Sequence, residues 1–597
     1  MRAMGKCFRR LLPLLLLTLP VVVQAQFTYT TNNGTITITG YTGPSGGVTI
    51  PDTITGLPVT CIADYAFYGN GNLTYLWLSD NVTNVGNYAC YGCQNLEDVE
   101  VGYGETTLGD HAFANCPQLG NVGLGSTVAI GNYAFANCMD LDNVESFDFV
   151  ATVGAYAFYQ CYSLTSISIG SVATTIGDYA FASCYNLWSA SLNSSVGIGS
   201  YAFANCMSLA SMTVPNTVTN VGTYAFFGCN SLITMSIGSG VTILNDHVFG
   251  SCLSLANVSL SSSIATIGDY AFDNCAGLTT ITVPNTVTAI GNYAFNNCTK
   301  LNNITIPYSV VSIGNAPFQS CTNLIAIMVN SQNLNYRSFD GVLFDKNLAT
   351  LIECPAGKAG SYSIPSGVTT IVAAAFANCL GLTNIAIPNG VTNIGQSAFS
   401  QCTGLKNVAI PIGVTAVTDS MFANCTQLTG VTIPNTVIVI GSSAFANCPG
   451  LTTISIPDSV TIIGDAAFAF CNGISSLTVS GSLASVGANA FRACRGLVNV
   501  TIPNSVTNIG IGAFWDCVSL SSFAIPSGVT TISDYTFMFC FSLSHVTIPN
   551  SVTSIGYSAF YECGLSSVIL PNSVISIGLY AFAYCGGLMR IPGAVGH

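Results

Sequence analysis

The chain has 597 residues, of which 50% are hydrophobic and only 6% are charged, with a formal net charge of −13. Ordinary soluble domains carry about 25% charged residues, and disordered chains combine low hydrophobicity with high charge. The composition therefore excludes both a disordered chain and an ordinary enzyme surface. No apolar run after residue 25 approaches the roughly 20 residues that cross a membrane, so no span is expected in the mature chain.

Residues 1–25 have the pattern of a secretory signal peptide. Four basic residues precede the apolar stretch Leu11–Val23, and Val23-Gln24-Ala25 supplies small residues before a cleavage point at Gln26. A membrane anchor is the alternative, which the short apolar stretch disfavours. Cleavage leaves eight basic and 25 acidic residues, a mature net charge of 8 − 25 = −17. We expect a secreted or cell-surface protein, and no nucleic-acid partner, because so acidic a chain repels phosphate backbones.

Residues 26–48 are predicted to form an N-terminal capping hairpin. Threonine alternates with aromatic and aliphatic residues over 27–43, on both sides of Asn33-Gly34. This combination is a strong signal for two antiparallel strands joined by a tight turn.

A period of 23 residues, occasionally 22, runs through the rest of the chain. A phenylalanine, in most units preceded by alanine, recurs from Phe67 to Phe318 and again from Phe376 to Phe582, with Cys90 in one gap. Such a period indicates repeated units that bury their apolar faces against one another. We predict a first repeat arm over residues 49–329 and a second over residues 361–592.

One unit, Leu278–Lys300, reads LTTITVPNTVTAIGNYAFNNCTK. Its alternating apolar residues predict a short strand that Pro284 ends. Gly291 is expected to allow a tight corner, and Asn292 to cap a helical turn that carries Phe295. The predicted fold class is an α/β repeat solenoid, a leucine-rich-repeat-like stack of about 23 coils of 23 residues, with one short strand and one short helical turn per coil.

The unit resembles the BspA-like leucine-rich repeat, whose pattern is close to L-x-x-I-x-I-P-x-x-V-T-x-I-G-x-x-A-F-x-x-C. The match extends over approximately residues 50–592. The resemblance implies a curved right-handed solenoid on a secreted or surface protein, with roles in adhesion to host proteins, other cells or matrix. The fold transfers through such a match, whereas function transfers only as a class, because repeats are scaffolds for unrelated binding tasks.

The repeat is interrupted over residues 330–360, where a β-hairpin is predicted around Asp345-Lys346-Asn347. Arg337, Lys346 and Lys358 concentrate positive charge in this segment. The interruption is either a partner contact or a simple structural insertion.

At the C-terminal end, residues 593–597 are predicted to form a tail without a cap. Either the chain is part of a longer parent, or its last coil is an open edge suited to end-to-end self-association.

An aromatic column lies two residues before the phenylalanine column in the first arm. Positions i and i+2 of a helical turn face nearly opposite ways, so these rings are expected to be at least partly outside. They form either an exposed stripe that binds sugars or a protein, or a row of rings that pack on one another, the interpretation we favour. The candidate stripe is Tyr133, Tyr156, Tyr179, Tyr201, Tyr224, Tyr270 and Tyr293, and the column also holds Tyr65, Tyr88, His111 and His247.

Cysteine is the most abundant reactive side chain. Of 25 cysteines, 21 lie three residues after the phenylalanine position, from Cys93 to Cys585. Adjacent coils bring such residues within disulfide reach, but a disulfide pairs cysteines, whereas this pattern places every thiol in an equivalent environment. A ladder of buried free thiols is therefore the favoured interpretation, with occasional adjacent disulfides as the alternative. Cys90-x-x-Cys93 is half of a zinc-site spacing without a second half.

The outward face of the strands is small and neutral in most coils. The first coils differ, because Tyr75 and Trp77 are followed one period later by Asp98 and Glu100. These four residues, together with Arg337, Lys346 and Lys358, are the candidate partner-binding residues. The rows of hydroxyl groups on later coils suit a repetitive ligand such as a polysaccharide. The alternative is that this face of the strands contacts no partner.

No catalytic constellation is found: the four histidines belong to no protease, triad or nucleophile-elbow motif. We expect no enzyme activity, no metal site and no cofactor. The predicted function is a leucine-rich repeat protein that binds an extracellular protein or polysaccharide in adhesion or recognition. The alternative is a structural rod of an extracellular matrix or a fragment of a larger surface protein.

Overall fold

The computed structural model describes residues 26–192, 196–479 and 481–588. The predicted signal peptide (1–25) and the predicted tail (593–597) lie outside the described residues. The chain forms two compact units, Met1–Phe295 and Asn296–His597. Each unit is a β-solenoid, and together they supply about 23 turns.

The first unit begins with the antiparallel pair β1 (Phe27–Asn32) and β2 (Thr35–Tyr41). The turn between them uses Asn33 and Gly34, both with positive φ, as a two-residue hairpin loop requires. Strand β2 then pairs in parallel with β5, which links the hairpin to the coils that follow.

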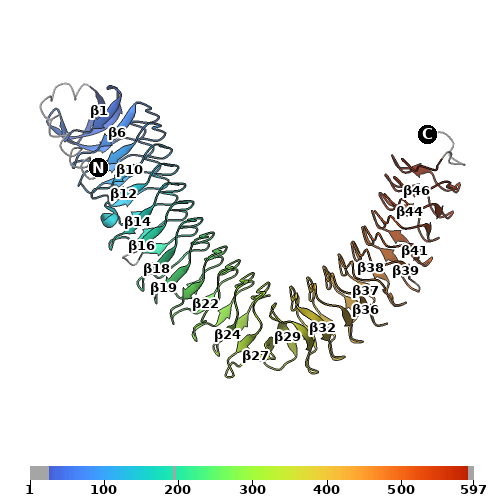
Figure 1. The fold of residues 1–597 in the computed structure, drawn as a ribbon. Helices are drawn as coiled ribbons and strands as arrows, with labels where there is room; N and C mark the ends of the chain where they lie inside the picture. The colour runs from blue at the N-terminus through green and yellow to red at the C-terminus, as the bar shows by residue number, and fades with distance from the viewer. Residues whose placement is uncertain (1–25, 193–195, 480, 589–597) are drawn as a thin grey trace, which may run out of the picture. The chain divides into compact units, whose positions relative to one another are not determined.

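Two parallel ladders run through the first unit, one built from the main strand of each coil and one from a second, shorter strand (Figure 1). The main ladder comprises β3 (Gly46–Thr49), β6 (Leu73–Trp77), β8 (Asp98–Glu100), β10 (Asn121–Gly123) and β12 (Asn143–Glu145), followed by β14 (Ser166–Ile169), β16 (Ser189–Leu192), β18 (Ser211–Val214), β19 (Thr234–Ile237) and β21 (Asn257–Ser259). The short ladder comprises β5 (Leu57–Ile62) with β4 (Thr53–Ile54) beside it, β7 (Asn84–Val85), β9 (Thr107–Leu108), β11 (Ala129–Ile130), β13 (Thr152–Val153), β15 (Thr175–Ile176) and β17 (Gly197–Ile198), then β20 (Ile243–Leu244), β22 (Thr266–Ile267) and β23 (Ala289–Ile290).

The second unit repeats this arrangement on both sides of an antiparallel insertion. Its main strands are β24 (Ile304–Ile306), β26 (Ile327–Val329), β30 (Gly360–Ser363), β32 (Leu382–Ala386), β34 (Asn407–Ala409), β36 (Gly430–Thr432), β39 (Ser476–Thr478), β41 (Asn499–Thr501), β43 (Ser522–Ala524) and β45 (His545–Thr547). Its short strands are β25 (Ser312–Ile313), β31 (Thr370–Ile371), β33 (Asn393–Ile394), β35 (Ala416–Val417), β37 (Val439–Ile440), β38 (Ile462–Ile463), β40 (Ser485–Val486), β42 (Asn508–Ile509), β44 (Thr531–Ile532), β46 (Ser554–Ile555) and β47 (Ser576–Ile577). The insertion pairs β27 (Tyr336–Phe339), β28 (Val342–Asp345) and β29 (Thr350–Glu353) antiparallel, and β29 continues the short ladder into β31.

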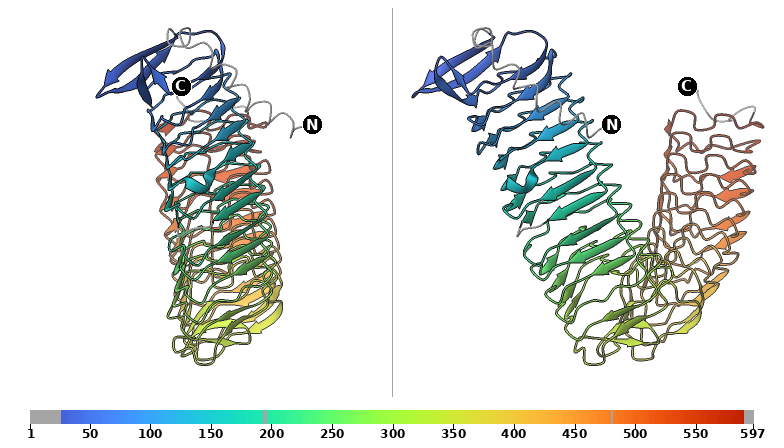
Figure 2. Two further views of the ribbon diagram at one scale, coloured as in Figure 1. Left: turned by 90° about the vertical axis from the view of Figure 1, so that its left-hand side faces the viewer. Right: turned by 60° about the vertical axis from the view of Figure 1, so that its left-hand side comes forward.

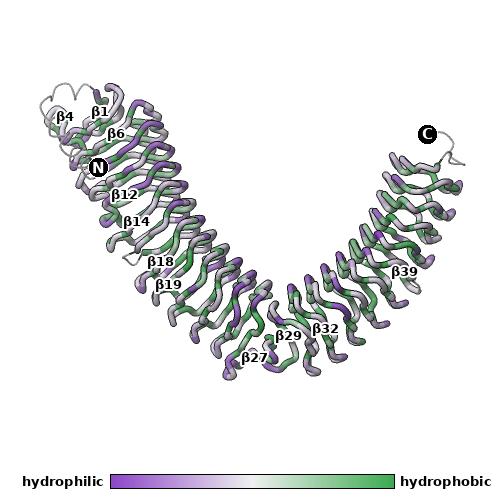
Figure 3. The backbone as a smooth tube through the Cα atoms, viewed as in Figure 1, coloured by the Kyte–Doolittle hydropathy of each residue, from purple (hydrophilic) through white to green (hydrophobic). Residues whose placement is uncertain are grey.

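The main strands line one side of each unit, as the turned views show (Figure 2). Their apolar residues alternate with polar ones along the chain (Figure 3). In β14, for example, Ile167 and Ile169 are buried and the two serines face out. The phenylalanine column is 0% exposed from Phe113 to Phe560, and rings of neighbouring coils stack, as Phe135 and Phe158 do at 5.1 Å between centroids. Each coil therefore buries its apolar face only against its neighbours, which is the basis of solenoid stability.

The predicted helical turn is wrong, and with it the α/β class. Among the described residues, helix is limited to the three-residue 3-10 turn η1 (Phe147–Phe149). The residue two positions before each phenylalanine has a positive φ, as at Tyr133 (57°), and so has the residue two positions after it, as at Asn137 (61°). A left-handed residue on each side of the phenylalanine ends any right-handed helix there.

The backbone N–H groups of this segment bond to the next coil. Phe135 N–H donates to the carbonyl of Ala157 at 2.8 Å, and Asn137 N–H donates to that of Tyr159 at 2.8 Å. Tight turns close the rest of the segment within the coil, since Ala136 N–H donates to the carbonyl of Tyr133. The backbone N–H groups of this segment therefore find their hydrogen-bond acceptors mainly in the next coil. In a helix, the acceptors would lie within the same segment.

The capping role expected for Asn292 is also wrong, because the coil offers no helix to cap. Side chains in this column instead accept a hydrogen bond from the backbone of the following coil. Asp269 Oδ1 accepts the N–H of Asn292 at 2.7 Å, and Asp269 Oδ2 accepts the Asn292 side-chain amide at 3.0 Å. The tight corner expected at Gly291 is a close approach between coils: a Cβ there would lie 2.5 Å from Asp269 Oδ1 and 2.6 Å from its backbone nitrogen.

Candidate functional site

The outward face of the first main strands carries the largest polar and aromatic side chains of that ladder. Strands β6 and β8 pair in parallel so that Tyr75 lies beside Asp98 and Trp77 lies beside Glu100. The sequence placed these four residues one period apart, and the structure brings them together. We call this group the N-terminal patch. Tyr75, Trp77 and Glu100 are partly exposed, and Asp98 is 9% exposed.

Asparagine side chains extend the N-terminal patch across the next two strands. Asn121 donates its side-chain amide to Asp98 Oδ1 at 3.1 Å and accepts that of Asn143 at 2.7 Å. Gly123 lies in register with Glu100, and a Cβ there would come within 2.1 Å of Glu100 Oε2. The missing side chain therefore leaves room for this carboxylate to lie across the neighbouring strand.

The charge of the first unit has a single sign outside the predicted signal peptide. Residues 26–295 contain 16 aspartates and glutamates and no lysine or arginine. Apart from histidine, the charged side chains in this range are therefore all negative. A surface field of one sign attracts cationic partners and repels anionic ones over about 10 Å at 0.1 M salt.

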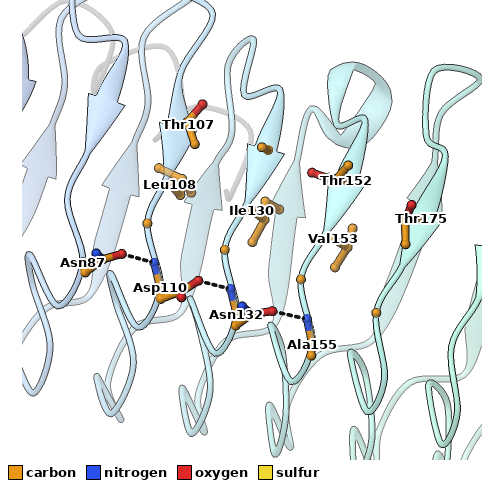
Figure 4. Close-up of a pocket in the computed structure, with 15 residues that line it drawn as sticks. Asn87, Thr107, Leu108, Asp110, Ile130, Asn132, Thr152, Val153, Ala155 and Thr175 are labelled. Carbon is orange, nitrogen blue, oxygen red and sulfur yellow. Dashed lines mark hydrogen bonds between the residues drawn. The ribbon is translucent and has the colours of Figure 1, made fainter.

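A shallow open groove of about 580 Å³ lies along the short ladder of the first unit (Figure 4). Its floor is a ladder of side-chain-to-backbone bonds: Asn87, Asp110 and Asn132 each accept the N–H of the following residue in the column, at 2.7–2.8 Å. These Oδ1 atoms hold adjacent coils together, so the groove is lined by structural bonds. Gly154 is one of the residues that line the groove. A larger residue would not fit there, because its Cβ would lie 2.5 Å from the backbone of Gly131.

The aromatic column of the first unit is one continuous stack of eleven rings. Centroids of successive rings lie 4.3–5.2 Å apart, with planes within 20° of each other. Each inner ring has both faces covered by its neighbours and is partly buried. Burial lowers the pKa of His111 and of His247, against the opposing effect of nearby aspartates, and so favours the neutral form of these two rings. The candidate stripe therefore presents ring edges, whereas sugar stacking requires open ring faces.

Two of the three cationic side chains of the interruption have partners within it. Lys346 Nζ donates to the carbonyl of Asn333. Lys358 Nζ pairs with Asp340 Oδ2 at 3.0 Å and lies 4.9 Å from the ring centroid of Tyr362. Arg337 is exposed on β27. These contacts hold the insertion against its neighbours and leave one of the three charges directed outward.

The described cysteines form no disulfide, and all except the partly exposed Cys61 are buried. Most thiols of the column donate to the carbonyl of the phenylalanine position in the preceding coil, as Cys138 does to Phe113 at 3.2 Å. Burial raises the pKa of Cys138 to about 12 and that of Cys448 to about 12. Burial thus favours the protonated thiol at Cys138 and Cys448, whereas hydrogen bonding with Cys116 and Cys90 lowers the pKa of Cys93 to about 4. The column forms the buried ladder that the sequence favoured.

A shallow hollow lies on the outward face of the second unit. Gly430 in β36 lies between Asn407 and Thr453, and an open depression of about 510 Å³ surrounds it. No charged side chain lines this depression. Its small neutral lining offers shape but few directed contacts.

A group of arginine and aromatic residues in the second unit was not predicted from the sequence. Arg492 lies against the ring of Trp515, with Cζ 4.2 Å from the ring centroid. Arg495 pairs with Asp516 Oδ2 through Nη2 at 2.7 Å. The signal was present: two arginines fall within four residues of a chain with 12 basic residues, and a tryptophan follows one period later.

Parallel strands stacked at a constant period, with one buried phenylalanine and one buried cysteine per coil, define a leucine-rich repeat solenoid. The model for the BspA type Leucine rich repeat region (6 copies) matches residues 60–188, 127–256, 242–348, 356–475 and 461–589. The chain therefore belongs to the BspA type leucine-rich repeat family. No curated protein matches the chain.

Solved structures with similar coils come from several bacteria. A leucine-rich repeat protein from Bacteroides ovatus is 22% identical, with 88% of this chain and 98% of that chain covered and a TM-score of 0.31. A leucine-rich repeat protein from Eubacterium ventriosum is 21% identical, with 90% and 92% covered and a TM-score of 0.30. A leucine rich cell surface protein from Faecalibacterium prausnitzii is 21% identical, with 88% and 93% covered and a TM-score of 0.26. Across the described part of the chain, no helix is long and apolar enough to cross a membrane.

Proposed function

We propose that this protein is a non-enzymatic recognition protein of the cell surface or extracellular space, and that the N-terminal patch binds a cationic protein partner in adhesion. The observation that supports this most directly is the register of β6 and β8, which sets Tyr75 and Trp77 beside Asp98 and Glu100. Aromatic residues are enriched among the side chains that dominate binding energy at interfaces.

Charge favours a partner rich in lysine and arginine. The carboxylates of the N-terminal patch lie in a unit without any basic residue between positions 26 and 295. A partner ammonium or guanidinium group would pair with Glu100 and stack on Trp77, a cation–π contact worth about 0.5–2 kcal/mol. A secretory signal, as expected at residues 1–25, would put this interaction outside the cell.

The experiment compares Trp77→Ala and Glu100→Gln with Trp188→Ala. Trp188 belongs to the same unit and is 59% exposed, so its removal controls for the loss of a surface tryptophan. The purified chain is applied to arrays of matrix proteins and glycans. We expect saturable binding to basic proteins that weakens at least tenfold in the two patch variants, weakens with added salt, and persists in Trp188→Ala.

Three outcomes would overturn the proposal. Equal binding by Trp77→Ala and the unaltered chain would remove the N-terminal patch from the interaction. Binding to neutral glycans alone, insensitive to salt, would replace the cationic partner by a polysaccharide. If no array component binds and the chain assembles end to end, the structural rod becomes the better description.

A further inference from the structure

The second unit carries a surface of arginine and aromatic side chains that is separate from the N-terminal patch. We call it the arginine–aromatic patch, and its members are Phe470, Arg492, Arg495, Trp515, Asp516 and Tyr535. Phe470 is 45% exposed, whereas Arg492, Trp515 and Tyr535 are partly buried. They come from four successive coils, whose backbones are bonded here: Phe470 N–H donates to the carbonyl of Arg492, and Ala493 N–H donates to that of Trp515.

Two aromatic rings lie close to the Arg492 guanidinium. Its Cζ lies 4.2 Å from the ring centroid of Trp515 and 5.8 Å from that of Phe470. Trp515 is supported in turn by the ring of Tyr535, stacked on it at 5.9 Å. A guanidinium packed beside aromatic rings keeps its planar fork of N–H donors, which can bind a carboxylate through two parallel hydrogen bonds.

The guanidinium donors of Arg492 have no hydrogen-bond or ion-pair partner among the described residues. Arg495 differs, since both Nε and Nη2 donate to Asp516 Oδ2, at 3.0 and 2.7 Å. The carboxylate next to Trp515 is therefore already used by Arg495. Arg492 remains as a positioned donor group beside an exposed aromatic ring.

This charge arrangement selects among anionic ligands. The arginine–aromatic patch holds one unpaired cation and one neutralised ion pair, in a chain with a net charge of −13. A polyanion such as heparin or nucleic acid needs several cations along its backbone, which this surface does not offer. A single carboxylate flanked by apolar groups fits both the free guanidinium and the rings of Phe470 and Trp515.

We propose that the arginine–aromatic patch binds an acidic segment of a protein partner. One Asp or Glu carboxylate pairs with Arg492, and a neighbouring aromatic or aliphatic side chain of the segment packs on Phe470 and the edge of Trp515. The arginine–aromatic patch binds a negative group, whereas the N-terminal patch binds a positive one. The two patches therefore bind different segments of one partner or different partners.

The test uses Trp515 as a reporter. Trp77→Phe and Trp188→Phe in the full chain leave Trp515 as the single tryptophan, since the sequence has three. This chain is titrated with the acetylated, amidated peptide Glu-Phe-Glu-Phe-Glu and with its Gln-Phe-Gln-Phe-Gln counterpart. We expect a saturable change in Trp515 emission with the acidic peptide and at least tenfold weaker binding of the neutral one.

Three variants separate the site from general charge effects. Arg492→Gln should weaken the acidic peptide at least tenfold, and Arg492→Lys should also weaken it, because lysine keeps the charge but loses the planar fork. Lys406→Gln, which removes an exposed cation elsewhere in the second unit, should bind as before. Circular dichroism confirms that each variant is folded. Equal affinity for the two peptides, an unchanged affinity in Arg492→Gln, or stronger saturable binding of heparin than of the peptide would overturn the proposal.

Discussion

Glu353 accepts the backbone N–H of Phe318 with both carboxylate oxygens, at 3.1 and 3.3 Å. In a regular coil this N–H donates to a backbone carbonyl of the next coil, as Phe376 does to Ala398 at 2.8 Å. The insertion displaces that carbonyl, and the side chain of Glu353 takes its place. The carboxyl group is buried, with the residue 3% exposed.

Stability of the second unit should therefore depend on pH through Glu353. Burial raises the pKa of Glu353 to about 8 from an ordinary value of 4.5, and the Phe318 N–H opposes this shift. The folded state thus binds the proton more tightly than the unfolded state. Its contribution is complete below pH 4.5 and is lost as the pH rises toward 8, with a slope of at most about 1.4 kcal/mol per pH unit.

Glu353→Gln keeps an oxygen for Phe318 and removes the titration. Urea unfolding at pH 5 and pH 8 should show a stability loss in the unaltered chain that is reduced or absent in the variant. Glu105→Gln, at an exposed position, is the control and should retain the full pH dependence. An equal pH dependence in Glu353→Gln would show that the pKa of Glu353 is not raised in the folded chain.

The cysteine ladder should resist modification until the chain unfolds. A thiol reacts as its thiolate, and burial raises the pKa of most column cysteines, to about 12 for Cys448. A thiol-specific reagent at pH 8 should label the partly exposed Cys61 first and the column cysteines only in denaturant. The ladder would be contradicted by rapid labelling of Cys448 in the native chain, or by column cysteines already oxidised before denaturation.

The period, the buried columns and the stacking of coils could be predicted from the sequence, because a unit of 23 residues is too short to bury its phenylalanine alone and must stack on its neighbours. The turn around Phe135 could not, because the positive φ of Tyr133 and Asn137 follows from hydrogen bonds to the next coil. A short Asn-x-x-Phe segment has the residues of a capped helix, and tertiary bonding decides against it. Propensity is a weak guide when the partner of each N–H lies 23 residues away.

Function was harder to predict than fold for a related physical reason. The repeat fixes the inward columns, so outward side chains such as Trp77 carry the information about partners. Arg492 and Trp515 were overlooked because their significance depends on a contact across coils, at 4.2 Å. The charge difference between residues 26–295 and the rest of the chain, in contrast, can be read directly from the sequence.

Gly154 should not tolerate a side chain. Its φ is not in the left-handed region, but a Cβ would lie 2.5 Å from the carbonyl carbon of Gly131 and 2.6 Å from the nitrogen of Asn132. We expect Gly154→Ala to force the two coils apart and to cost about 1–3 kcal/mol of stability. Gly197→Ala is the matched control in the same unit, because its nearest neighbour would be 3.9 Å away. Equal thermal unfolding of the two variants would contradict the close approach of coils.

The stacked aromatic column should stabilise the first unit through ring contacts. The ring of Tyr179 lies 4.5 Å from that of Tyr156 and 4.4 Å from that of Tyr201. Each such contact is worth about 0.5–1.5 kcal/mol, so Tyr179→Ala should lose about 1–3 kcal/mol of unfolding free energy in urea. Tyr179→Phe keeps the ring and should lose much less. Tyr179→Gly separates the ring from the backbone, since glycine adopts the φ of 58° without strain. Because glycine also relieves the strain of the positive φ, the contribution of the ring is measured by comparing Tyr179→Ala with Tyr179→Phe. Equal unfolding free energies of these two variants would show that the stack contributes nothing.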